Sequence, residues 1–166
     1  MRKVGWVVGG VAVTGAALFL NYYLPSREIV RVVGTEVVRS ETRAADGSTT
    51  VNDMRLINAV DARGRPAVFR NQDTGWGWPP YFKFNSADLS ARAGDVVSTQ
   101  ENPRWVVVTS YGWRINLLSR FPNAVAMRPA AGPDETLIPW FNIAVVALLA
   151  AAVLTARRRI MRLFGD

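Results

Sequence analysis

The chain has 166 residues, of which 49% are hydrophobic, and a formal net charge of +7. This length suffices for one domain of about 110 residues and two membrane spans. The sequence contains no Cys and no His. Disulfides and thiolate nucleophiles are therefore excluded, and the usual neutral-pH general base and commonest metal ligand are missing. The composition predicts a protein without a metal site, without a cofactor and without enzyme activity.

The distribution of charge argues against a nucleic-acid partner. Residues 25–137 hold 14 basic and 12 acidic side chains, so the excess lies at the two ends of the chain. A nucleic-acid-binding protein is expected to concentrate its basic residues on the domain itself. The basic residues at the ends flank two apolar segments instead: Arg2, Lys3, Arg157, Arg158, Arg159 and Arg162.

The first apolar segment predicts a transmembrane helix over residues 4–24, after a cytoplasmic end of residues 1–3. Residues 4–20 carry no charge, and Pro25 cannot continue a helix. The alternative is a cleaved signal peptide, because a charged start followed by an apolar run is typical of both. Residues 20–25 contain no small-residue cleavage site, which favours an uncleaved anchor.

The second apolar segment predicts a transmembrane helix over residues 138–156, followed by a basic tail over residues 157–166. Pro139 suits the first helical turn, and Trp140 suits a membrane interface. Since positively charged ends stay in the cytoplasm, both termini are predicted to be cytoplasmic. Residues 25–137 are then a periplasmic domain of a bacterial inner-membrane protein.

Small residues recur every three or four positions on both predicted helices. Such faces let helix backbones approach closely, either in one chain or between two membrane proteins. The helix-packing residues predicted in this way are Gly5, Gly9, Ala12, Ala16, Ala144, Ala147 and Ala151.

The central segment reads as a small β-rich domain. Its strand-like segments are residues 29–39, 55–60, 67–70, 105–109, 114–118 and 124–128, with a hairpin turn at 61–64. Residues 105–109 form a continuous apolar run and predict a strand buried on both faces. Ser86 is the predicted N-cap of one helix, and residues 40–53 are polar enough to predict an exposed loop. The fold class is therefore membrane-anchored α+β, with two transmembrane helices flanking a mainly antiparallel sheet or partial barrel.

Two aromatic motifs supply the candidate binding residues. Trp76, Trp78 and Tyr81 lie in a loop rich in Gly and Pro. Their rings could plug the end of the sheet, enter the bilayer interface, or stack on a sugar or peptide. Trp113 and Arg114 belong to a Tyr-Gly-Trp-Arg stretch that predicts either a clamp at a strand turn or a cation–π pair.

The blocks from Asn71 to Phe84, from Tyr111 to Arg114 and from Phe121 to Asn123 resemble an uncharacterised proteobacterial family. This family is found mainly in alphaproteobacteria and has a membrane-anchored architecture with GWGWP…YFKF, YGWR and FPN blocks. The resemblance covers nearly the whole chain. It implies one folded unit between the helices, and it implies no activity.

Two functions remain open. The first is an accessory, assembly or structural subunit of an inner-membrane complex, whose partners are membrane lipid and another membrane protein or a second copy of the chain. The alternative is a periplasmic module that recognises a glycan or peptide through Trp76, Trp78 and Tyr81. An enzyme is the weakest hypothesis, since a carboxylate pair such as Asp73 with Asp88 has no supporting spacing.

Overall fold

The structure is a computed structural model. It describes the backbone of residues 2–43 and 49–164, and the side chains of residues 10–39, 53–115 and 117–162. The chain forms two units, Met1–Glu135 and Thr136–Asp166. Each unit contains one long helix, α1 (Arg2–Tyr23) in the first and α3 (Trp140–Phe164) in the second.

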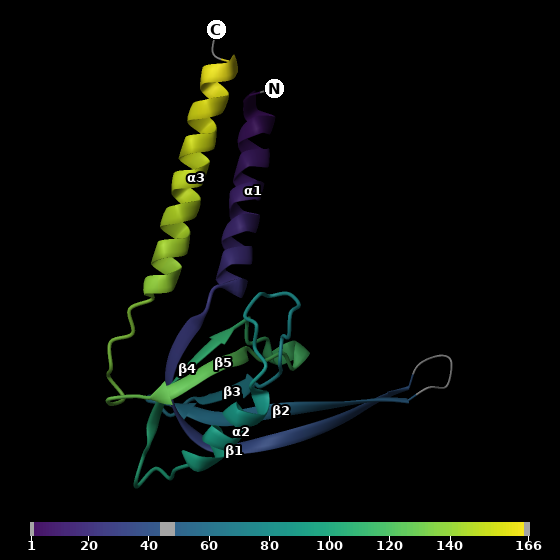
Figure 1. Cartoon of the computed structure of the whole chain (residues 1–166), viewed down its shortest axis with the longest axis vertical. Helices are drawn as coiled ribbons and strands as arrows, with labels where there is room; N and C mark the ends of the chain where they lie inside the picture. The colour runs from purple at the N-terminus through teal and green to yellow at the C-terminus, as the bar shows by residue number, and fades with distance from the viewer. Residues whose placement is uncertain (1, 44–48, 165–166) are drawn as a thin grey trace. The chain divides into compact units, whose positions relative to one another are not determined.

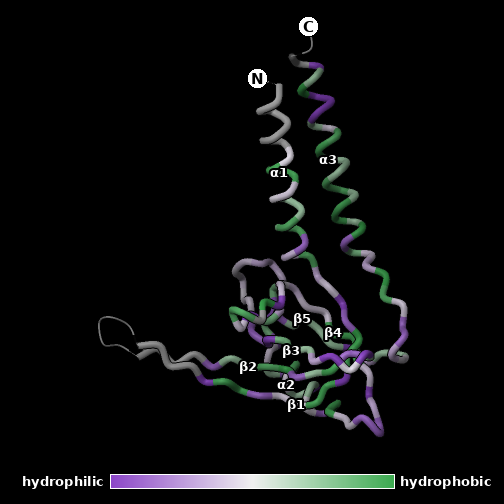
Figure 2. Tube along the Cα trace, turned by 180° about the vertical axis from the view of Figure 1, so that it is seen from behind, coloured by the Kyte–Doolittle hydropathy of each residue, from purple (hydrophilic) through white to green (hydrophobic). Residues whose placement is uncertain are grey.

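Helix α3 has the properties of a membrane span. Residues Trp140–Arg162 have a mean hydropathy of 1.8, and none of this stretch is buried. Figure 2 shows the apolar residues along most of α3 and the polar ones near its end. Among the described residues, α3 is the one helix long and apolar enough to cross a membrane. The first predicted segment is also helical. Whether α1 is a second membrane span stays a prediction.

The first unit contains a closed five-stranded barrel with the strand order β1-β2-β3-β5-β4 (Figure 1). The strands are β1 (Ser26–Arg43), β2 (Thr49–Asp61), β3 (Pro66–Arg70), β4 (Trp105–Tyr111) and β5 (Asn123–Pro129). Strands β3 and β5 pair in parallel, and the other neighbours are antiparallel. With helix α2 (Ser86–Asp95) between β3 and β4, this is the topology of the Greek-key barrel called the OB-fold. The α+β prediction is confirmed, and the sheet closes fully.

The core is formed by alternating apolar residues of the strands. Val30, Ile57 and Phe69 are fully buried, and Leu89 of α2 packs against the same cluster. Three consecutive residues of β4, Val106–Val108, are also buried. This confirms the strand predicted to be buried on both faces.

The prediction of an exposed loop over residues 40–53 is wrong for residues 40–43 and 49–53, and residues 44–48 lie outside the described part of the chain. Beyond their pairing with β4 and β3, residues 32–43 of β1 and 49–55 of β2 continue as an antiparallel ribbon, here called the arm, whose register runs to Arg43 opposite Thr49. Arg39 and Asp53 form a salt bridge across the arm at 3.0 Å. The sequence of this segment lacks apolar alternation, so its polar composition resembled that of a loop.

Two smaller predictions are also wrong. Residues 114–118 form no strand, because a short 3₁₀ helix at Asn116–Leu118 follows an isolated bridge between Ile115 and Arg120. Ser86 is not the N-cap of α2; that position belongs to Asn85, and the Ser86 hydroxyl donates to Asp73 at 2.6 Å. In both places tertiary contacts override a local sequence signal.

Candidate functional site

The last turn of α1 is attached to the barrel through what we call the junction. Three residues of this turn accept hydrogen bonds from residues far away in the sequence. These bonds run from Trp113 Nε1 to Asn21 Oδ1 (2.8 Å), from Gly112 N to Tyr22 O (2.9 Å) and from the Tyr81 hydroxyl to Tyr23 O (2.5 Å). The carbonyl groups at the end of a helix have no partner within the helix, and the barrel supplies partners for two of them.

Aromatic rings fill the space around these hydrogen bonds. Trp78 lies against Phe19 with ring centroids 6.1 Å apart and against Tyr23 at 5.4 Å. Trp113 meets the edge of Tyr22 at 5.3 Å. Because Phe19 lies one turn before Tyr23, the loop carrying Trp78 extends back along the helix.

A buried polar network lies under the junction. Tyr81 stacks on Tyr111 at 4.6 Å, and burial, together with Tyr111, raises the pKa of Tyr81 to about 12. Asn123 donates to the Tyr111 hydroxyl at 3.2 Å. Its amide also accepts from the backbone N–H of Gln72 at 2.9 Å and donates to the Gln72 carbonyl at 3.0 Å. This side chain therefore joins the end of β3 to the start of β5, where the barrel closes.

Lys83 is the other centre of this network. It is only 3% exposed, and its Nζ donates to Asn71 Oδ1 and, at 3.3 Å, to the Gln72 carbonyl. Burial lowers the pKa of Lys83 to about 8; the positive charge of Arg55 acts in the same direction, and Asp73 opposes it. A buried amine with a lowered pKa is often found at functional sites, but structural networks also produce one.

A polar cleft of about 690 Å³ opens between one face of the arm and the start of α2. Asp73 accepts hydrogen bonds there from the backbone N–H of Ser86 at 2.9 Å and from its hydroxyl, and Arg55 donates to the Ser86 hydroxyl oxygen at 3.0 Å. The polar groups of this cleft thus bind one another, as a structural network does.

A second cleft, here called the basic cleft, has a volume of about 600 Å³ and lies beside the junction. It is lined by Tyr22, Met54, Arg70, Trp113, Ile115, Leu118, Ser119, Arg120 and Phe121. These residues include two arginines and no carboxylate. The Nε atom of Arg70 is buried and has no hydrogen-bond partner among the described residues.

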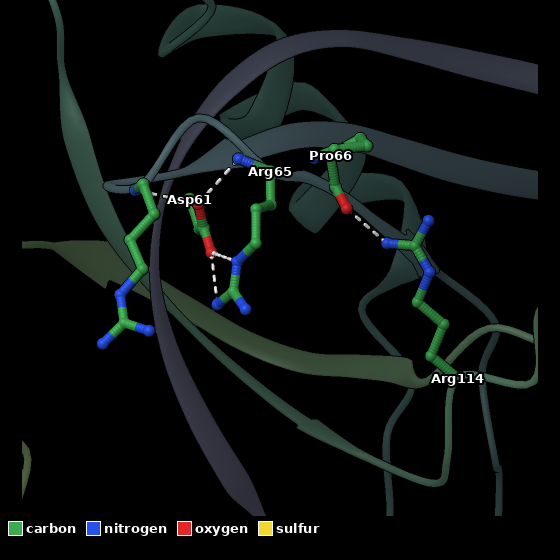
Figure 3. Close-up of polar contacts among 5 residues, drawn as sticks. Asp61, Arg65, Pro66 and Arg114 are labelled. Atoms are coloured by element: carbon green, nitrogen blue, oxygen red, sulfur yellow. Dashed lines mark hydrogen bonds and ion pairs between the residues drawn. The ribbon is translucent and has the colours of Figure 1, made fainter.

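The turn between β2 and β3 is a separate polar cluster (Figure 3). Asp61 accepts hydrogen bonds from the backbone N–H groups of Arg63 and Arg65, and from the Arg65 side chain. These bonds, led by that of the Arg65 backbone, lower the pKa of Asp61. Arg114 donates to the carbonyl oxygen of Pro66 and so ties the β4–β5 loop to this turn.

The structure brings together only part of the predicted binding residues. Trp78, Tyr81 and Trp113 meet at the junction, whereas Arg114 reaches the β2–β3 turn. Trp76 contacts Phe82 and Phe84 and is 83% exposed.

The predicted helix-packing residues are exposed where the structure describes them. These are Ala12 and Ala16 on α1, and Ala144, Ala147 and Ala151 on α3. The burial of Gly5 and Gly9 lies outside what the structure describes. Whether these small residues contact another helix stays a prediction.

Sequence reasoning missed the polar residues inside the barrel, above all Asn71, Lys83 and Asn123. The one available signal was Lys83 itself, since it is one of only two lysines and lies between Phe82 and Phe84. Among the described residues, no group of three or more Asp or Glu side chains is placed to hold a metal ion.

Comparison with known proteins places the whole chain in one family. Residues 1–164 match the family described as "Protein of unknown function (DUF1523)". An uncharacterised protein of Haemophilus influenzae is 34% identical over 146 residues, which cover 82% of this chain and 80% of that protein. No solved structure matches the chain. The resemblance to an uncharacterised family is confirmed at this level, while its sequence blocks and its alphaproteobacterial distribution stay predictions. The chain belongs to the DUF1523 family.

Proposed function

We propose that the chain is a non-enzymatic subunit that supports or assembles a protein complex of the bacterial inner membrane. In this proposal α1 and α3 both span the membrane, and residues 25–137 form a periplasmic domain. The apolar α3, the helical conformation of α1 and the basic residues at both chain ends support this arrangement.

The junction is the observation that carries the proposal. A ligand-binding domain on a flexible tether needs no hydrogen bonds between its barrel and its anchor. Here the last turn of α1 is bound to the barrel through Tyr81, Gly112 and Trp113. The barrel is therefore held next to the end of α1, which suits a protein that presents a fixed surface to a membrane partner.

The arm provides a second supporting observation. Strand β4 pairs with β1 only up to Arg31, and β3 pairs with β2 only from Leu56 onward. The outer edges of the arm therefore have no strand neighbour among the described residues. An isolated two-stranded ribbon is marginally stable in water, and free edges readily pair with another chain. An arm of this kind suits contact with a partner protein.

The test is purification of the full-length protein in mild detergent, followed by mass spectrometry of the co-migrating proteins. The proposal predicts a stoichiometric inner-membrane partner, or a second copy of the chain, held through the small-residue helix faces. Ala147→Leu and Gly9→Leu are expected to release it. Val153→Leu and Val11→Leu, on the opposite helix faces, are expected to retain it.

Two results would refute the proposal. One is purification as a monomer without any partner. The other is a complex that survives both Ala147→Leu and Gly9→Leu, because the small-residue faces would then have no role. Circular dichroism of each variant checks that the barrel is still folded.

The exposed rings favour one alternative function, a periplasmic module that binds a glycan or peptide. Trp76 is 83% exposed beside Phe82 and Phe84, which are also more than half exposed. Such rings can stack on a sugar or peptide. The alternative predicts that Trp76→Ala abolishes binding of envelope glycans or peptides to the full-length protein, while Trp105→Phe does not.

A further inference from the structure

The basic cleft differs from the other polar sites of the barrel in having unneutralised charge. The carboxylates of the polar cleft and of the β2–β3 turn bind neighbouring donors. The lining of the basic cleft contains Arg70 and Arg120 and no acidic residue. The cleft therefore carries a positive potential, which favours an anionic ligand.

Arg70 is positioned to bind such a ligand. It lies at the end of β3 next to the fully buried Phe69, so its side chain points outward from the barrel, toward the cleft that it lines. A phosphate oxygen is well suited to the planar guanidinium group, which binds phosphate through paired hydrogen bonds.

Apart from Ser119 and the two arginines, the residues that line the cleft are apolar or aromatic. Tyr22 and Trp113 form one side, and their rings are 5.3 Å apart. Leu118 is 62% exposed at the cleft, and the neighbouring Leu117 is 94% exposed. Exposed leucines next to a basic cleft favour a ligand that is both anionic and apolar.

The position of Tyr22 indicates where that ligand comes from. Tyr22 belongs to the last turn of α1, so a cleft with Tyr22 in its wall lies at the membrane surface if α1 spans the bilayer. We propose that the basic cleft binds the phosphate headgroup of an anionic membrane phospholipid, with Arg70 and Arg120 on the phosphate and the exposed leucines along the acyl chains. This inference rests on the proposed membrane anchoring and adds a specific lipid site to it.

The test is lipid binding by the delipidated full-length protein in detergent, followed by native mass spectrometry and calorimetry. The probes are dioctanoyl phosphatidylglycerol, dioctanoyl phosphatidylcholine and inorganic phosphate. We expect saturable binding of one phosphatidylglycerol that is at least tenfold tighter than binding of the other two. Arg70→Gln and Arg120→Gln are each expected to weaken it about tenfold or more, since each removes a charge-assisted contact.

Arg63→Gln is the matched control, because Arg63 is an exposed arginine on the β2–β3 turn and does not line the cleft. Arg120 is exposed as well, so its substitution tests the site even if Arg70→Gln reduces stability.

Three outcomes decide the proposal. If inorganic phosphate bound as tightly as phosphatidylglycerol, the proposal that the ligand is a lipid would be wrong. Absence of phosphatidylglycerol binding, or equal weakening by Arg63→Gln, would overturn the site. Co-purification of a protein partner without lipid binding would refute this inference alone and leave the proposed function intact.

Discussion

The buried Lys83 predicts how the stability of the barrel depends on pH. In an unfolded chain a lysine has a pKa near 10.5, whereas in the barrel the pKa of Lys83 is lowered to about 8. Between these two values the unfolded chain binds more protons than the folded one. The free energy of unfolding must therefore rise as the pH increases from about 8 toward 10.5. Below pH 8 the folded protein carries the full cost of a buried ammonium group.

The magnitude follows from the size of the pKa shift. One pKa unit corresponds to about 1.4 kcal/mol, so the lowering of the Lys83 pKa from 10.5 to about 8 limits the rise in the free energy of unfolding to about 3.5 kcal/mol. Asn71 and Gln72, the hydrogen-bond partners of Lys83, line the polar cleft. We expect solvent near the network to reduce the rise in the free energy of unfolding to between about 1 and 3 kcal/mol. For a barrel of this size, this corresponds to a rise in melting temperature of several degrees.

The assay is thermal unfolding of the full-length protein in detergent at pH values from 7 to 9.5, followed by circular dichroism. The chain has no His and no Cys, so the side chains whose ordinary pKa lies closest to this range are absent. Lys83→Met should flatten the profile. Lys3→Met changes the only other lysine and should leave the profile unchanged. A flat profile for the unmodified protein, or a sloping profile for Lys83→Met, would show that Lys83 does not control this pH dependence.

Three further substitutions test the junction and the closure of the barrel by the same unfolding measurement. Tyr81→Phe keeps the stacked ring but removes the hydrogen bond to Tyr23, and should cost about 0.5–1.5 kcal/mol; no change at all would show that this bond is dispensable. Asn123→Ala removes three hydrogen bonds from a side chain that is 1% exposed, and should cost about 2–4 kcal/mol; a cost below 1 kcal/mol would argue against its role in closure. Gly112→Ala forces an alanine to φ +95° and should cost about 1–3 kcal/mol, whereas Gly10→Ala lies in a helix with open space around it and should be neutral or slightly stabilising.

The segments with a strong local signal were predicted well from the sequence. The apolar runs became α1 and α3, and the valine run became the buried strand β4. In these segments the local pattern of apolar residues is enough to predict a helix or a buried strand, so no knowledge of distant residues is required. The hairpin turn at residues 61–64 was equally clear from its glycine. In the structure Gly64 adopts φ +78°, a conformation that favours glycine.

The junction could not be predicted, because its partners are distant in the sequence. Trp113 and Asn21 are 92 positions apart, and no local pattern indicates that they meet. The parallel contact between Arg70 and Asn123, which closes the barrel, is equally non-local. Both depend on the order of the strands in the barrel rather than on the residues of one segment.

The burial of Lys83 was missed for a different reason. Hydropathy would place Phe82 and Phe84 inside the protein and Lys83 outside, but the two phenylalanines are 54% and 56% exposed and Lys83 is buried. The positive φ of Phe82 turns the chain at this point. The hydrogen bonds to Asn71 and Gln72 then compensate for the burial of the amine.

The most direct test of the central claim, a periplasmic barrel held at the membrane by α1 and α3, is cysteine labelling in intact cells. Because the chain has no Cys, Arg2→Cys, Arg63→Cys and Arg158→Cys each introduce a unique thiol. With this topology, a membrane-impermeant maleimide should label Arg63→Cys in intact cells and should label Arg2→Cys and Arg158→Cys only after lysis. Labelling of either terminal cysteine from outside, or protection of Arg63→Cys until lysis, would contradict it.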